Sequence, residues 1–366
     1  MNLLPPPPGS VASRSRSFFY TRHSPRLTAH RNAALIPTAA PQSFKPDQPR
    51  GNPVPDPINI QTRILNGASD GPRCLITGGV HGDEFESMHA IRRLSRSLDP
   101  ATLRGTLTLA PVVNESAYNR RHRTGDDELD LARICPGSPD GTVSMRTAHA
   151  LTQLIAAADY YIDLHTGGTG LAVWPLAGYG LHHDPAILDT QRRMARAFNL
   201  PLVWGTCGKL DGRSLSVARD HNVPAIYAEY HGSAVCLPHG VDAYVDGCLN
   251  VLAEIGMIDR PHPPSAIQWV IEDDRPNAGH MQICHPAPMS GYFDPVVHLG
   301  QQVQKGDPLG AVCDILGDTV QTLTAELTGI VITLHTYPKI DKGDGLVVIA
   351  DTDYALIDRK ARNVTN

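Results

Sequence analysis

The segment from Gly78 to Glu84 places a histidine and a glutamate three residues apart, where an apolar run gives way to a helical pattern. An imidazole nitrogen and a carboxylate oxygen both bind zinc well, with bonds of about 2.0–2.2 Å, so one tight turn can supply two ligands. His81 and Glu84 are therefore candidate metal ligands. The alternative is structural, because the dipole of a helix favours an acidic residue in its first turn whether or not a metal is bound.

A second apolar run ends at His165, a candidate third ligand. Asp163 lies on the same face of this predicted strand, because alternate residues of a strand face the same side. Histidines that bind a metal usually donate their other ring N–H to a carboxylate. Asp163 is therefore a candidate orienting group, for instance for His81, or else it caps the local turn.

A third run, from Pro224 to Gly232, places Glu229 at the end of an apolar strand. A buried carboxylate is costly unless it has a partner or a function. Acting as a general base beside a metal-activated water is one such function. His231 follows two residues later, and we interpret it as a structural or substrate-facing histidine, because a hydrolytic zinc keeps one position open.

A fourth segment, from Pro111 to Arg123, contains Asn114 and several arginines, and a further arginine, Arg133, follows it. A guanidinium group can polarise a carbonyl oxygen or bind a carboxylate through two hydrogen bonds. The alternative interpretation is a solvated basic loop.

The elements around these residues alternate between strands and helices. The predicted strands are Arg73–Val80, Leu107–Val113, Tyr160–His165, Leu202–Trp204 and Ala225–Tyr230, and the predicted helices are Phe85–Leu98, Val143–Ile155 and Ile187–Phe198. This alternation predicts an α/β domain with a mostly parallel or mixed sheet flanked by helices. Ligands bind at the carboxyl ends of the strands in such sheets, so the four polar segments are expected to converge there.

The two ends of the chain differ from this middle part. Residues 1–50 are rich in Pro, Arg and Ser, which predicts a disordered or extended tail, and residues 51–262 hold the predicted catalytic domain. Residues 263–366 predict a β-rich domain, with a hairpin unit around Lys305-Gly-Asp repeated around Lys342-Gly-Asp. The repeat is similar to that of biotinyl and lipoyl carrier domains, but the stretch 315–326 between the two units lacks the lysine that such a carrier modifies.

Composition excludes several classes of protein. The 366 residues carry a net charge of −5 and 5% aromatic residues, which argues against a nucleic-acid partner. No run is long and apolar enough to predict a membrane span. The seven cysteines form no Cys-x-x-Cys pair, which is typical of reduced thiols in a cytoplasmic protein.

Together these residues resemble the succinylglutamate desuccinylase/aspartoacylase family, zinc amidohydrolases related to the zinc carboxypeptidases. The resemblance covers about Arg73 to Gly256, and the β-rich tail, expected to be a sandwich or barrel, agrees with the C-terminal domain of that family. It implies one zinc ion per subunit, bound by His81, Glu84 and His165, with Glu229 as the catalytic glutamate. The family's loop arginine, which polarises the scissile carbonyl, corresponds to Arg123.

The family motif Asp-Leu-Asn-Arg-x-Phe-Pro-Gly corresponds to residues 130–137 with two differences. The family's Asn–Arg pair binds the carboxylate of the released amino acid, whereas here Ala132 replaces the asparagine and Arg133 remains. Cys135 replaces the phenylalanine, which we interpret as a change in packing. Arg133, Asn114 and His231 are thus the predicted substrate-binding residues, and the implied substrate is an unusual N-acyl amine or amino acid.

The resemblance implies hydrolysis of the amide bond of a small N-acyl substrate, and a homo-oligomer is compatible with it. Two alternatives remain: a zinc carboxypeptidase acting on short peptides, and a metal-containing binding protein without catalysis. A serine hydrolase is not supported, because the sequence lacks Gly-x-Ser-x-Gly.

Overall fold

The computed structural model describes residues 57–276, 278–281 and 284–356, all of which belong to one compact unit. The tail predicted for residues 1–50 lies outside the described residues. No helix in the described part of the chain is long and apolar enough to cross a bilayer.

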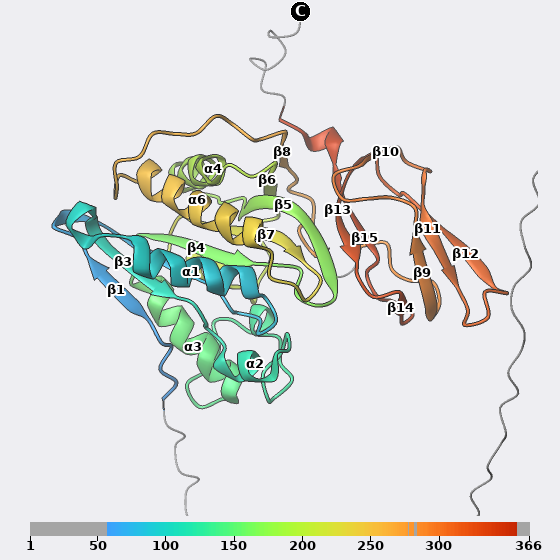
Figure 1. Ribbon diagram of the computed structural model, residues 1–366, viewed down its shortest axis with the longest axis horizontal. Coiled ribbons are helices and arrows are strands. Elements are labelled where there is room, and N and C mark those ends of the chain that lie inside the picture. The colour runs from blue at the N-terminus through green and yellow to red at the C-terminus, as the bar shows by residue number, and fades with distance from the viewer. Residues whose placement is uncertain (1–56, 277, 282–283, 357–366) are drawn as a thin grey trace, which may run out of the picture. The chain divides into compact units, whose positions relative to one another are not determined.

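The first part of the chain alternates strands with helices (Figure 1). Its strands are β1 Arg63–Asn66, β2 Ser69–Thr77, β3 Arg104–Ala110, β4 Tyr160–His165, β5 Leu171–Gly180, β6 Leu202–Thr206, β7 Ala225–Gly232 and β8 Trp269–Glu272. Its helices are α1 Phe85–Ser97, α2 Glu115–Arg120, α3 Val143–Ala156, α4 Pro185–Phe198, α5 Ser214–Asp220 and α6 Pro238–Glu254.

These strands form a mixed sheet. Strands β3, β2, β4 and β7 are parallel neighbours in that order, while β1 and β5 pair antiparallel with β3 and β7. Strand β6 is parallel to β5, and β8 is parallel to β6. The prediction of an α/β sheet with helices is thus confirmed.

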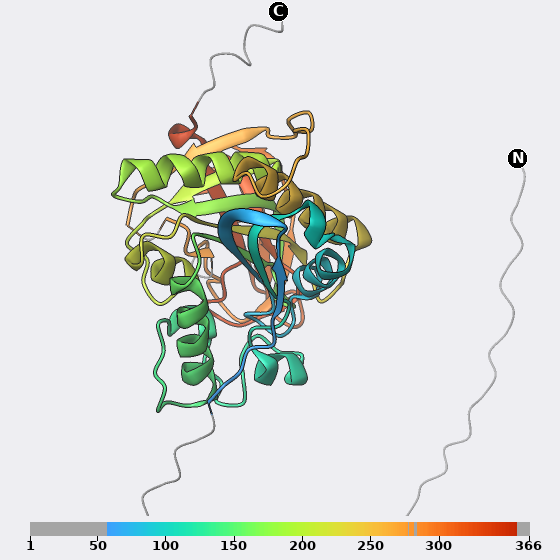
Figure 2. The ribbon, with the colours of Figure 1, turned by 90° about the vertical axis from the view of Figure 1, so that its left-hand side faces the viewer.

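Helices pack on both faces of the sheet. Apolar residues of α1, α4 and α6 share one core with the sheet, among them Leu94, Phe198 and Tyr244. Residues of α3 and α5 share a second core, among them Leu151 and Val217. Figure 2 shows α1 and α3 on opposite sides of the first strands. Because both faces are covered, the central strands are continuous apolar runs.

The remaining strands make up a β-rich C-terminal region. They are β9 Gly291–Pro295, β10 Gln302–Val303, β11 Pro308–Cys313, β12 Val320–Thr324, β13 Gly329–His335, β14 Lys339–Ile340 and β15 Val347–Asp351. Four of them form a separate sheet in the order β12-β11-β9-β14, whereas β10, β13 and β15 continue the large sheet, where β13 pairs with β5. Residues of both sheets share one apolar core, including Phe293, Leu309 and Val347.

The large sheet does not end where the sequence predicted the end of the catalytic domain. We assigned residues from 263 onward to the C-terminal domain, but Trp269–Glu272 form β8 and pair with β6. Val270 and Ile271 are buried, and the strand covers what would otherwise be an open edge of β6.

The two repeated units form matching turns. Gly306 and Gly343 have φ angles of 95° and 96°, a left-handed conformation that glycine adopts without strain. In each turn the aspartate that follows accepts a hydrogen bond of 2.8 Å from the backbone N–H three residues before it. The prediction of two equivalent turns is confirmed, but the prediction that each is a hairpin is wrong. Strands β10 and β11 flank the first turn, and β14 and β15 flank the second, and in each case the two strands belong to different sheets and do not pair with each other.

Candidate metal centre and substrate pocket

The first two candidate ligands lie in the turn between β2 and α1. His81 and Glu84 are 3% and 1% exposed, and α1 begins directly after Glu84. The turn packs closely on α2, because a Cβ at Gly82 would lie 2.0 Å from the carbonyl carbon of Ala117. Only glycine allows that approach. The local sequence thus directs both side chains inward.

The third candidate ligand reaches the same point from β4. His165 is the last residue of that strand, and its Nδ1 lies 3.0 Å from Oε2 of Glu84. The Nδ1 of His81 lies 2.6 Å from Oε1 of the same carboxylate. One ligand atom from each of the three residues lies within 4.8 Å of the others, a group able to hold a metal ion.

Each histidine also contacts a carboxylate through its other ring nitrogen. His81 Nε2 donates to Asp130 at 3.0 Å, and His165 Nε2 lies 3.0 Å from Asp163. Such contacts fix the tautomer and the orientation of the ring. Both Nδ1 atoms therefore face Glu84; without a metal they donate to its carboxylate, and on losing that proton each offers a lone pair to a metal ion.

This geometry corrects the pairing suggested by the sequence. Asp163 contacts His165, two residues on in the same strand, and the partner of His81 is Asp130. Asp163 is fully buried, and it also accepts hydrogen bonds from the Thr77 hydroxyl, at 2.7 Å, and from the Ser214 hydroxyl. It is therefore a buried hydrogen-bond centre rather than a turn cap.

Asp130 links the histidine to an arginine. Its Oδ2 accepts from Nε of Arg123 at 3.0 Å, and Nη2 of the same guanidinium lies 2.9 Å away. Burial raises the pKa of Asp130, but His81 and Arg123 outweigh it and hold the pKa well below its usual range. Burial likewise opposes ionisation of Glu84, yet His81 and His165 hold its pKa well below the usual range.

Glu229 faces the same cluster from β7. It lies opposite His165 in the parallel register of β4 and β7, and it is 7% exposed. Its Oε2 has no hydrogen-bond partner in the part of the chain that the structure describes. Burial raises the pKa of Glu229 to about 7; His165 lowers it and Glu84 adds to the rise. A buried carboxylate without a partner beside a possible metal site is suited to moving protons.

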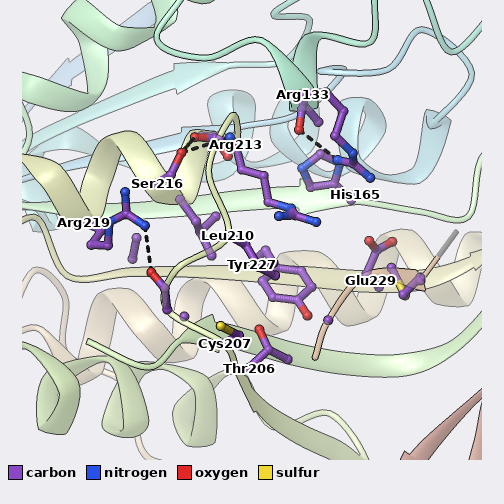
Figure 3. A pocket seen from close by; sticks show the side chains of 18 of the residues that line it. Arg133, His165, Thr206, Cys207, Leu210, Arg213, Ser216, Arg219, Tyr227 and Glu229 are labelled. Carbon is purple, nitrogen blue, oxygen red and sulfur yellow. Dashed lines mark hydrogen bonds between the residues drawn. The ribbon is translucent and has the colours of Figure 1, made fainter. Parts of the chain in front are cut away.

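A pocket opens over this cluster (Figure 3). His81, Glu84, His165 and Glu229 line one end of it, together with Arg123. Arg133 and Arg213 also line it, and burial lowers the pKa of both guanidinium groups. Ala132, where the family has asparagine, lines the pocket next to Arg133.

Two predicted substrate-binding residues do not line this pocket. Asn114 is buried and caps α2, where its Oδ1 accepts from the N–H of Ala117 at 3.1 Å. His231 has a left-handed φ of 49°, which breaks the alternation that would place it beside Glu229, and its ring packs against Tyr230 and His239. Both therefore have local structural contacts. Cys135 is buried in an apolar core, in keeping with a packing role.

Three residues that the sequence analysis did not select belong to the site. They are Asp130, Arg213 and Tyr227. Arg213 and Tyr227 had a detectable signal: Arg213 lies in the loop after the predicted strand Leu202–Trp204, and Tyr227 precedes Glu229 by two residues in the same strand. Asp130 is the first residue of the motif at 130–137, but the pattern does not reveal its partner, because the contact joins residues 49 apart through an irregular loop.

Comparison with known proteins places this site in a family. A family model, the succinylglutamate desuccinylase/aspartoacylase catalytic domain, matches residues 70–255. The chain belongs to this family. The match includes all three candidate ligands and Glu229.

The chain is also similar to individual proteins. It is 29% identical over 294 residues to an N-alpha-acetyl-L-2,4-diaminobutyric acid deacetylase from Halomonas elongata, covering 77% of this chain and 83% of the relative. The product-bound ectoine utilization protein EutE (DoeB) from Ruegeria pomeroyi superposes with a TM-score of 0.73 at 26% identity, over 80% of this chain and 89% of the other. A succinylglutamate desuccinylase/aspartoacylase from Rhodobacter sphaeroides gives a TM-score of 0.73 at 26% identity, over 82% and 90%.

Proposed function

We propose that this protein is a zinc-dependent hydrolase that cleaves the amide bond of a small N-acyl amino acid. One observation carries the proposal: two imidazoles and a carboxylate converge, each imidazole is held by a second carboxylate, and the unpaired carboxylate of Glu229 faces the same pocket. The names of the relatives, a deacetylase and a desuccinylase family, support the same reaction class.

The residues present fit one zinc ion per chain. His81, Glu84 and His165 would hold it, since two nitrogen donors and one carboxylate leave a position open for a reacting molecule. When bound, zinc supplies an electrophile that polarises the acyl carbonyl and makes a water molecule easier to deprotonate.

Glu229 moves the proton in this proposal. Its buried carboxylate accepts a proton from the attacking water as the new C–O bond forms at the acyl carbon. The same carboxyl then donates that proton to the amide nitrogen as the C–N bond breaks, so that the products are a carboxylic acid and an amine. A pKa raised to about 7 by burial suits both steps near neutral pH.

The arginines stabilise negative charge. Arg123 is anchored on Asp130, and its Nη1 lies 4.0 Å from Glu84, so it can donate to the acyl oxygen as charge develops there. Arg133 and Arg213 line the same pocket and would bind the carboxylate of the amino-acid half. Arg213 compensates here for the amide that is absent at Ala132.

The test is a turnover screen on protein whose metal content has been measured. N-acyl amino acids, N-acyl diamines and short peptides are compared for the wild type and for Glu229→Gln. We expect hydrolysis of N-acyl amino acids by the wild type, and loss of turnover in the variant with one bound zinc ion retained. Preference for peptides would favour a carboxypeptidase, and zinc binding without any turnover would favour a binding protein. Full activity of Glu229→Gln would show that the base is misassigned.

A further inference from the structure

The pocket continues beyond the metal cluster into what we term the far compartment, lined by Gly180, Leu181, Thr206, Leu210, Leu215 and Tyr227. Tyr227 separates it from Glu229. The two residues share one face of β7, about 7 Å apart along the strand. In Figure 3, Tyr227 lies between Glu229 on one side and Leu210 on the other.

Two glycines of β5, Gly178 and Gly180, leave room for the Tyr227 ring and for the far compartment because neither has a side chain. Gly178 is opposite Tyr227 in the antiparallel register, and a Cβ there would lie 2.3 Å from the tyrosine ring. The ring therefore rests directly on the backbone of β5. Gly180 is on the same face two residues later, and the nearest atom to a Cβ there is Gly208 Cα, at 3.7 Å. The space above Gly180 is therefore open.

In the part of the chain that the structure describes, the far compartment offers no carboxylate to pair with a cationic substrate. Among the described residues that line the pocket, the carboxylates are Glu84 and Glu229, both at the metal end. Arg219 also lines the pocket, and it is paired with Asp211 and Asp220, each at 2.8 Å, two carboxylates that do not line the pocket. An ammonium group placed here would lose its hydration without gaining an anion, which is unfavourable.

We propose that the far compartment binds an uncharged, mainly apolar side chain of the amino acid that is released. Leu181, Leu210 and Leu215 are partly exposed and provide apolar contacts, and Thr206 provides a hydroxyl. The inference rests on the proposed function and specifies its substrate: an N-acyl amino acid with an apolar side chain, in contrast to the diamino acid named for the Halomonas relative.

Binding to zinc-loaded Glu229→Gln, measured by calorimetry, tests this directly. The ligands are N-acetylnorleucine, Nα-acetyl-2,4-diaminobutyrate and N-acetylglycine. We expect N-acetylnorleucine to bind at least about tenfold more tightly than the other two, because matched apolar contacts are worth about that factor. Equal or tighter binding of the diaminobutyrate derivative, or no binding of any ligand, would overturn the inference.

A second variant probes the compartment itself. Gly180→Val, added to the same protein, fills the open space; the position is in a strand without a positive φ, so valine fits the backbone. N-acetylnorleucine should bind about tenfold more weakly, while N-acetylglycine, which has no side chain, should change by less than about twofold. Thr322→Val, in the exposed strand β12, is the control and should change neither affinity. An unchanged affinity of Gly180→Val for N-acetylnorleucine would also refute the inference.

The two proposals can fail separately. If the wild type hydrolyses none of the compounds although N-acetylnorleucine binds as expected, the proposed function fails and the far compartment stands. If hydrolysis occurs but the diaminobutyrate derivative is preferred, the far-compartment inference alone fails.

Discussion

Replacing Asp130 by asparagine isolates the contribution of the carboxylate behind His81. Asp130 uses one oxygen to accept from His81 and the other to bind Arg123. An asparagine has a single oxygen, so its NH₂ group must face one of these two donors. Losing such an orienting partner costs about 10–100-fold in metal affinity, and tenfold in affinity corresponds to about 1.4 kcal/mol. We therefore expect zinc affinity to fall by about 10–100-fold.

The assay is competition for zinc against a chromophoric chelator, with thermal unfolding of the metal-free protein to verify the fold. Asp159→Asn is the matched control. Asp159 also binds an arginine through both oxygens, with Arg73 Nη2 at 2.6 Å and Nε at 3.2 Å, but it contacts no histidine. Its pair is exposed, so solvent screening leaves it only a small contribution to stability. A zinc affinity for Asp130→Asn equal to that of this control would refute the orienting role.

Three further predictions concern Arg123, Glu229 and the two glycine turns. Arg123→Ala should lower kcat by about 100–1000-fold with zinc still bound, since it removes a donor to the developing oxyanion; steady-state kinetics with unchanged kcat would contradict this. In metal-free protein, the carboxyl of Glu229 has its pKa raised from 4.5 to about 7, so ionising it costs folding free energy as the pH rises between those values. Glu229→Gln should therefore gain stability relative to the wild type from pH 4.5 to about pH 7 and no more above it; a constant difference in urea unfolding across that range would exclude the effect. Gly306→Ala and Gly343→Ala should each destabilise the protein by about 1–2 kcal/mol, because both residues have the same left-handed φ; clearly unequal losses on chemical denaturation would show that the two turns are not equivalent.

The strands that carry the site could be predicted because they are buried on both faces. The predicted range of β4 matches the structure, and the predicted cores of β2, β3, β6 and β7 are correct. Since these strands are mostly parallel, their carboxyl ends share one edge, which is why His81, His165 and Glu229 could be expected to meet.

Two long elements, β5 and α6, were not predicted because each contains residues that disfavour its type of secondary structure. Strand β5 contains Pro175, which disfavours a strand, but the proline lies at a register shift between Val173 and Leu176, where a ladder hydrogen bond is not required. Helix α6 contains Gly240 and Gly247, which lower helix propensity. A Cβ at Gly247 would lie 2.3 Å from the ring of Phe198, so close packing rather than propensity selects glycine there.

The parts of the site that could be predicted from the sequence are those that lie at the ends of strands. The carboxylate behind His81 belongs to Asp130. Their contact joins the turn between β2 and α1 to an irregular loop, and no periodicity marks such a contact. For His231 the sequence left a structural and a substrate-facing role open. Its ring packs against Tyr230 and His239, in keeping with the structural role, and its left-handed φ cannot be read from strand alternation.

We propose that His81, Glu84 and His165 hold one metal ion next to Glu229. Anomalous diffraction at the zinc edge from zinc-loaded crystals tests it most directly. We expect one ion per chain, bonded at about 2.0–2.2 Å to both histidine Nδ1 atoms and to the Glu84 carboxylate. An ion bound elsewhere, or no ion in the pocket at saturating zinc, would contradict it.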